Sequence, residues 1–279
     1  MEKSTARLVN TSTSRSRNVS AKKNAGISAG ASQNVMNTAD NNDTRSKLVV
    51  IPAFNEEKNL PSVLSDVNEH LPDFDVVVVN DGSQDRTAEI AAAYGAAVVS
   101  HPVNIGYGVA VQTGFRYASH HAYDTVVLMD ADGQHNAADA PELVRALDEH
   151  HADMVIGSRF MKQRAYKTTL ARRMGRNIFS LIINILTHRH FVDITSGYKV
   201  LNSRAVAFLS LNYPVDFPDA EVIITMLLSG FDVAEAPANF RQRSIGRSMF
   251  SLSKKIYYPF KCLLAIVVVV MRASLTKRE

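Results

Sequence analysis

The sequence predicts an α/β domain built on a mostly parallel β-sheet that is flanked by helices. Short runs of valine, isoleucine and leucine recur along the chain, and near-continuous apolar runs are typical of strands buried on both faces. Segments with helical periodicity separate these runs, and this alternation is typical of βαβ units. A chain of 279 residues that is 46% apolar is long enough to bury a core of this size.

Strands and helices are expected to alternate between residues 47 and 158. The predicted strands are KLVVIPAF, DVVVVND, AAVVSH, TVVLMD and DMVIGS, at residues 47–54, 75–81, 96–101, 125–130 and 153–158. The predicted helices lie between them, at residues 57–70, 85–94, 106–121 and 138–150. Because ligands bind at the carboxyl ends of the strands in such sheets, polar residues that directly follow a strand are the candidate site residues.

The pattern changes after residue 159. A basic loop leads to an apolar helix at 178–186, the loop VDITSGYKVLN follows, and further helices are expected near 204–211 and 219–228, before a strand around 232–243. Residues 46–158 hold seventeen acidic and five basic side chains, whereas residues 159–279 hold nineteen basic and seven acidic ones. This segregation predicts one half that holds cations and one that meets an anion or an anionic surface, although charge that is merely solvated leaves the same pattern.

The two ends of the chain differ from the middle in composition. Residues 1–45 are rich in serine, threonine, asparagine and basic residues, so we expect a disordered tail. The single cysteine, Cys262, excludes an internal disulfide and suits a reducing compartment. Residues 251–279 contain the apolar run Cys262–Met271, which falls short of the ~20 residues that span a bilayer. We expect an amphipathic helix there, either at a membrane interface or packed against the protein.

Two aspartates, Asp130 and Asp132, follow the predicted strand in TVVLMDADGQH. Two carboxylates this close repel each other unless a cation or a shared proton relieves them. Their hard oxygen atoms suit Mg²⁺ or Mn²⁺, which typically use one or two carboxylates together with substrate phosphates. A polar turn at Asp132 and Gly133 explains the same residues without a metal.

Seven motifs together resemble the catalytic domain of glycosyltransferase family 2, an α/β domain of the GT-A type that binds nucleotide sugars. They are VIPAFNEE, VVNDGSQDRT, NIGYGVAVQTGF, LMDADGQH, GSRF, DITSGYKVLN and FRQRSIGRS. The last two resemble the branch that transfers mannose or glucose to polyprenyl or dolichyl phosphate. The resemblance covers roughly residues 47–255 and implies a catalytic domain at 46–250, with a donor and metal half at 46–158 and an acceptor half at 159–250.

The resemblance also implies roles for single residues. Asp130 and Asp132, assisted by Gln134, would hold Mg²⁺ or Mn²⁺ against the donor diphosphate. The nucleotide pocket would be lined by Pro52, Ala53, Asn55, Glu56 and Asp81, with Gly106 allowing close approach. Contacts to an acceptor phosphate or a diphosphate would come from Arg159, Arg172, Arg173, Arg243 and Ser248. Asn80 and Met249 stand where many members carry aspartate and lysine.

The acceptor stays open in the sequence. A lipid monophosphate is already largely anionic at neutral pH, since its second pKa is near 6, and needs positioning arginines more than a base. A saccharide hydroxyl would need a general base, for which Asp193, Asp219 and Glu221 are candidates. A non-catalytic protein that binds nucleotide sugars is a further alternative, although it would not need Asp130, Asp132, Arg243 and Ser248 together.

The expected partners follow from these roles. They are a nucleotide-sugar donor linked to UDP or GDP, a lipid-phosphate acceptor and an anionic membrane surface, and no nucleic acid is expected. The chain is expected to be cytoplasmic and peripherally bound to the cytoplasmic face of a membrane, in a role such as cell-envelope assembly. A homo-oligomer stays open.

Overall fold

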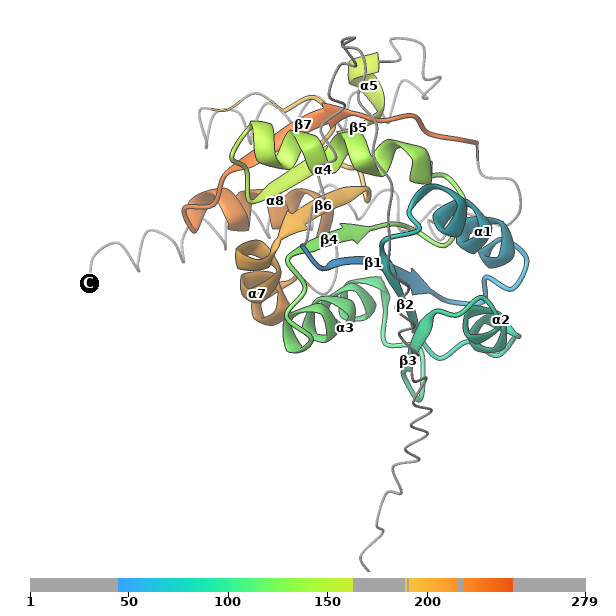
Figure 1. Cartoon of the computed structure of the whole chain (residues 1–279). Coiled ribbons are helices and arrows are strands. Elements are labelled where there is room, and N and C mark those ends of the chain that lie inside the picture. The colour runs from blue at the N-terminus through green and yellow to red at the C-terminus, as the bar shows by residue number, and fades with distance from the viewer. Residues whose placement is uncertain (1–44, 163–188, 190, 215–217, 243–279) are drawn as a thin grey trace, which may run out of the picture. The chain divides into compact units, whose positions relative to one another are not determined.

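A computed structural model describes residues 45–162, 189, 191–214 and 218–242 (Figure 1). Its sheet has seven strands in the order β3-β2-β1-β4-β6-β5-β7. The strands are β1 (Lys47–Ala53), β2 (Asp75–Asn80), β3 (Ala97–Ser100), β4 (Thr125–Leu128), β5 (Met154–Ser158), β6 (Lys199–Asn202) and β7 (Val233–Pro237). Of these, β6 alone runs antiparallel to its neighbours, so the expectation of a mostly parallel sheet is confirmed.

Helices cover both faces of this sheet. They are α1 (Leu60–His70), α2 (Thr87–Ala93), α3 (Tyr107–His120), the short 3₁₀ helix η1 (Ala137–Asp139), α4 (Ala140–Glu149), α5 (Arg159–Lys162), α7 (Ser203–Asn212) and α8 (Pro218–Leu228). In Figure 1, α4 lies on one side of the sheet and α3 and α7 on the other. Alternate residues of β1 enter two separate cores: Leu48 and Val50 join the core under α3 and α7, whereas Val49 and Ile51 join the core under α1 and α4.

Helix α3 packs very closely on β1. A Cβ atom placed on Gly114 would lie 2.2 Å from the Val50 Cγ1 atom, so only glycine fits between the helix and the strand at this contact. Val50 itself is fully buried. This contact sets the height of α3, and therefore of its first residue Tyr107, above the sheet.

The structure corrects one sequence expectation and leaves others open. The stretch Lys199–Asn202, expected to lie in a loop, forms β6, because its short KVLN run gains hydrogen-bonding partners in both β4 and β5. The predicted helix at 178–186, the tail at 1–44 and the helix at 251–279 lie outside the described residues. The predicted domain boundaries therefore stay predictions.

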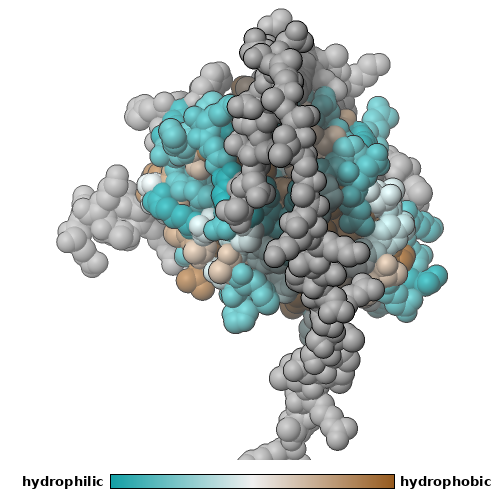
Figure 2. Space-filling view, in the orientation of Figure 1, coloured by the Kyte–Doolittle hydropathy of each residue, from teal (hydrophilic) through white to brown (hydrophobic). Residues whose placement is uncertain are grey.

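On the face shown in Figure 2, most coloured residues are hydrophilic, with scattered hydrophobic ones between them. Within the described ranges, no helix is both long enough and apolar enough to cross a bilayer.

Candidate functional site

Predicted site residues that follow β1, β2, β4 and β5 lie at the carboxyl edge of the sheet. Strands β1, β2, β4 and β5 all end there, and β6 begins there because it runs the other way. Its first residue, Lys199, pairs with Leu128 on β4 and Ile156 on β5. The loop before β6, which carries the TSGYK motif, therefore reaches the same edge as Asp130.

Asp130 is half-buried and is contacted from three segments. The Tyr107 hydroxyl, at the start of α3, donates a 2.9 Å hydrogen bond to Asp130 Oδ1. His135 Nε2 lies 3.5 Å from Asp130 Oδ2. A Cβ atom on Gly197 would lie 2.8 Å from that same Oδ2, so the backbone before β6 closes the remaining side.

His135, which the sequence reasoning did not assign, is buried beside this carboxylate. The Asp130 N–H donates to His135 Nδ1 at 3.0 Å, so a neutral ring carries its proton on Nε2, facing Asp130. The ring stacks on Tyr198 with centroids 4.8 Å apart and meets Phe240 edge-on. Burial lowers the pKa of His135 to about 4, although the Asp130 charge opposes that shift, so the imidazole is neutral at neutral pH.

Asp132 and Gln134 follow in the same loop. The Asp132 carboxylate accepts the Gln134 N–H at 3.0 Å, as in an Asx-turn, and both side chains are half-buried. Among the described residues, no group of three histidine, cysteine, aspartate or glutamate side chains could hold a metal ion. Two carboxylates and an amide oxygen still fit Mg²⁺ or Mn²⁺, because such ions complete their ligand set with substrate phosphates.

Asp81 organises the loop before α3. Its buried carboxylate accepts the backbone N–H groups of Ile105 and Gly106, at 2.9 and 2.8 Å, and lies 2.8 Å from His101 Nδ1. Gly106 has a φ of 115°, which a residue with a side chain rarely adopts. Asp81 thus fixes the backbone immediately before Tyr107, a role that the sequence did not indicate.

The loop after β1 is joined to the loop after β2. The Asn55 backbone N–H donates to the Ser83 hydroxyl at 2.9 Å, while its side-chain oxygen accepts the Gln84 N–H at 2.8 Å. Glu56 donates its backbone N–H to Thr87 and accepts a 2.6 Å bond from the Asn59 amide. These bonds place Asn55 and Glu56 at the edge of the sheet where a nucleotide pocket is expected. Pro52 and Ala53, the last residues of β1, lie next to them in the chain.

Arg159, directly after β5, is bound to the buried Asp193. Its backbone N–H and Nε donate to Asp193 Oδ2, and Nη2 donates to Oδ1. These bonds hold the pKa of Asp193 below its usual value although desolvation, the largest single influence, raises it. Glu235 accepts the Asp193 N–H at 2.6 Å and fixes this loop to β7. Asp193 is therefore an ionised partner of Arg159, an arrangement that favours a positioning role over that of a general base.

The remaining predicted site residues lie on α8 or outside the described residues. Asp219 and Glu221 lie in the first turn of α8, the helix that leads into β7. Arg172, Arg173, Arg243 and Ser248 lie outside the described residues, so their predicted roles stay predictions.

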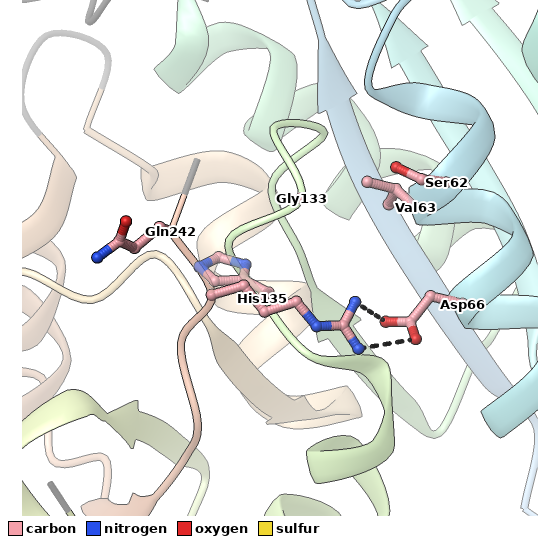
Figure 3. Close-up of a pocket in the computed structure, with 7 residues that line it drawn as sticks. Ser62, Val63, Asp66, Gly133, His135 and Gln242 are labelled. Carbon is pink, nitrogen blue, oxygen red and sulfur yellow. Dashed lines mark hydrogen bonds and ion pairs between the residues drawn. The ribbon is translucent and has the colours of Figure 1, made fainter. Parts of the chain in front are cut away.

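The segment after β7 folds back onto the DADGQH loop, since the Arg241 N–H donates to the Gln134 carbonyl at 2.8 Å. Asn239 binds Asp139 through its backbone and side-chain N–H groups, at 2.7 and 2.8 Å. Arg241 pairs with both oxygens of Asp66 on α1, at 3.1 Å each, and the dashed lines at Asp66 in Figure 3 mark this ion pair. A pocket of about 140 Å³ lies between these elements, lined by Ser62, Val63, Asp66, Gly133, His135, Arg241 and Gln242. Arg243, predicted to contact a phosphate, comes directly after Arg241 and Gln242 in the chain, and these two residues lie next to the DADGQH loop.

Comparisons with known proteins agree with this geometry. A family model described as glycosyl transferase family 2 matches residues 48–207. Polyprenol monophosphomannose synthase of Mycolicibacterium smegmatis is 30% identical over 75% of this chain and 82% of its own length. Undecaprenyl-phosphate mannosyltransferase of Micrococcus luteus is 30% identical over 73% of this chain and 87% of its own length.

Solved structures support the fold. Glucosyl-3-phosphoglycerate synthase from Mycobacterium tuberculosis, in complex with phosphoglyceric acid, superposes with a TM-score of 0.63 at 20% identity, over 81% of this chain and 80% of that one. The same enzyme in complex with Mn²⁺, uridine diphosphate and phosphoglyceric acid superposes with a TM-score of 0.61 at 20% identity, over 82% of this chain and 78% of that one. The predicted GT-A type fold is therefore confirmed.

Proposed function

The chain belongs to glycosyl transferase family 2, and on that premise we propose that it is a metal-dependent, inverting enzyme that transfers a hexose from a nucleotide sugar to a polyprenyl phosphate. One observation carries the proposal. The carboxylates of Asp130 and Asp132 follow β4, and the Arg159–Asp193 pair follows β5, at the same edge of the sheet. A cation-binding site and an oriented guanidinium at one edge of the sheet suit a reaction between two phosphate-bearing molecules.

On the donor side, Asp130 and Asp132, with Gln134, are the residues that would hold Mg²⁺ or Mn²⁺. When bound, such an ion stabilises the charge that develops on a leaving nucleoside diphosphate. The loops of Asn55, Glu56 and Asp81 would bind the nucleoside, because they form the same edge of the sheet. The relatives' solved complexes with Mn²⁺ and uridine diphosphate support a divalent ion and a nucleoside diphosphate for this fold.

On the acceptor side, Arg159 would orient a phosphate, joined by the predicted Arg172, Arg173, Arg243 and Ser248. The names of the two relatives, which refer to polyprenol monophosphomannose and undecaprenyl phosphate, support a lipid phosphate. A phosphate monoester is already an anionic nucleophile at neutral pH, so its attack needs no side-chain base. The commitment of Asp193 to Arg159 is consistent with a reaction of this kind.

A lipid acceptor implies that the enzyme works at a membrane surface. We place this contact in residues 251–279, where lysines and tyrosines precede the apolar run Cys262–Met271. The proposed location is the cytoplasmic face of the membrane. Removal of residues 256–279 should abolish binding to anionic phospholipid vesicles. Unchanged binding would instead favour a segment that packs against the protein.

The function is tested with a panel of UDP- and GDP-linked hexoses, each offered to a polyprenyl phosphate with Mg²⁺ or Mn²⁺. Mass spectrometry of the lipid product should detect one hexosyl phosphodiester, and its formation should stop when the metal is chelated. A parallel set replaces the polyprenyl phosphate with the corresponding polyprenol and with free saccharides. Transfer to a hydroxyl acceptor alone would overturn the phosphate assignment and revive the search for a base.

A further inference from the structure

We propose that Tyr107, His135 and Gly197 act together as positioning residues that fix the Asp130 carboxylate in the orientation needed to bind the metal ion. The inference rests on the proposed function, since it takes Asp130 to be a metal ligand. The three residues come from three separate segments: the start of α3, the loop after β4 and the loop before β6.

Tyr107 fixes the first oxygen. Its hydroxyl donates to Asp130 Oδ1 at 2.9 Å. The backbone before it is held in turn, because Asp81 accepts the N–H groups of Ile105 and Gly106. The phenol therefore approaches Asp130 from an anchored helix start, and its position does not depend on a flexible loop.

His135 binds the backbone of Asp130 and lies beside the second oxygen of its carboxylate. Its Nδ1 accepts the Asp130 N–H at 3.0 Å, and its Nε2 lies 3.5 Å from Oδ2 of the same residue. The ring cannot turn away, because Tyr198 stacks on its face at 4.8 Å and Phe240 closes its edge. One imidazole is thus hydrogen-bonded to the main chain of Asp130 and lies beside its carboxylate.

Gly197 acts through the absence of a side chain. A Cβ atom there would lie 2.8 Å from Asp130 Oδ2 and 3.4 Å from Oδ1, so the carboxylate fills the space that a larger residue would need. The loop of the predicted acceptor half thereby limits where the ligand of the donor half can move.

The chemistry of these neighbours suits a ligand of a cation. The Tyr107 hydroxyl orients the carboxylate by a hydrogen bond, and the His135 ring accepts the Asp130 backbone N–H and lies beside Oδ2. A carboxylate that is already oriented loses less conformational freedom when it binds. Outer contacts of this kind typically change metal affinity by about 10- to 100-fold when they are removed.

The test measures Mn²⁺ affinity directly, by calorimetry and by electron paramagnetic resonance of free Mn²⁺, with UDP or GDP present as the probe diphosphate. Tyr107→Phe and Gly197→Ala should each weaken Mn²⁺ binding by about 10- to 100-fold while leaving the melting temperature close to that of the parent. His135→Gln should do the same if it folds, and the other two variants keep the test valid if it does not. Tyr123→Phe is the matched control, since Tyr123 donates to Asp75 on β2, away from the metal loop.

Asp130→Asn separates the two levels of the argument. If Asp130→Asn leaves Mn²⁺ affinity unchanged, Asp130 is not a ligand and the proposed metal site itself fails. If Asp130→Asn abolishes Mn²⁺ binding but Tyr107→Phe and Gly197→Ala bind Mn²⁺ like the parent, the metal site stands and the positioning role is overturned.

Discussion

Arg159 and Asp193 lie 34 positions apart in the chain, yet three hydrogen bonds join them, from the Arg159 backbone N–H, Nε and Nη2. Asp193 has no exposed surface, whereas the Arg159 side chain keeps 21% of its own. The pair closes the region that starts after β5 and returns at β6. It holds an arginine at the site with its planar group already oriented.

Replacing Asp193 with asparagine should lower the free energy of unfolding by about 3 kcal/mol, because it removes one partner of a buried ion pair. Urea denaturation followed by circular dichroism measures this loss. Asp232→Asn is the control, since Asp232 pairs with Arg189 at an exposed position and should change stability by less than about 1 kcal/mol. Equal losses in both variants would contradict the buried character of the Arg159–Asp193 pair.

The same pair predicts a dependence of stability on pH. The pKa of Asp193 is lower in the folded protein than in the unfolded chain, so the unfolded state takes up protons first as the solution is acidified. The stability from this pair is therefore fully present above the unfolded pKa of ~3.9 and is lost as pH falls through the folded value. Urea midpoints between pH 7 and pH 3 should fall more steeply in the parent than in Asp193→Asn. Parallel curves would refute this assignment.

Asp130→Ala and Asp132→Ala should each abolish metal-dependent turnover, since each removes one of the two carboxylates proposed to hold the ion. Product formation is measured over a range of Mn²⁺ concentrations. Asp148→Ala, at an exposed aspartate paired with Arg45, should retain the parent's activity. Undiminished transfer by either of the first two variants would end the assignment of this loop as the metal site.

Gly114→Ala should destabilise the protein by about 1–3 kcal/mol, because the added methyl group overlaps the buried Val50 side chain. The greater helix propensity of alanine acts in the opposite direction, so the sign of the change reports the packing. Val50→Ala removes the overlapping atom. The double variant should therefore be more stable than the sum of the two single losses predicts, whereas strict additivity would show that α3 and β1 are less tightly packed here.

Asp66→Asn and Arg241→Gln should affect activity more than stability. The Arg241 side chain is 51% exposed, so a double-mutant cycle on unfolding should give a coupling of at most about 1 kcal/mol. The pair nevertheless anchors the backbone that leads to Arg243, so turnover should fall by more than that coupling implies. Steady-state kinetics with both substrates measures it, and unchanged kinetics would show that Arg243 is placed without this anchor.

The sequence predicted the sheet and the polar residues at its carboxyl edge because both depend on local signals. Runs such as VVVV at 76–79 and VVLM at 126–129 are apolar throughout, and a polar residue follows each of them. Strand β6 was not predicted, because KVLN is short and carries a lysine. Its strand conformation depends on pairing with β4 and β5 on both sides. Local composition cannot report that pairing.

Part of the candidate site could be proposed from the sequence for the same reason. Asp130 and Asp132 were visible because two like charges at a strand end are unusual. The neighbours of Asp130 were not, because Tyr107, His135 and Gly197 meet only after three segments pack together. His135 had one signal, its place five residues after Asp130 in the same loop, but its buried position comes from Tyr198 and Phe240, far along the chain.

The reversed direction of β6 has a consequence for how such enzymes can diversify. The chain leaves the sheet at Ser158 and re-enters it at Lys199, and the two strands involved are neighbours, with Ile156 paired to Lys199. The connection between these two strands therefore leaves and returns at the same edge of the sheet, and the Arg159–Asp193 pair joins its two ends. Insertions in a connection of this kind leave the register of the sheet intact and cost little loop entropy. Mutation can therefore change the residues between Arg159 and Asp193 while strands β1, β2 and β4 stay unchanged.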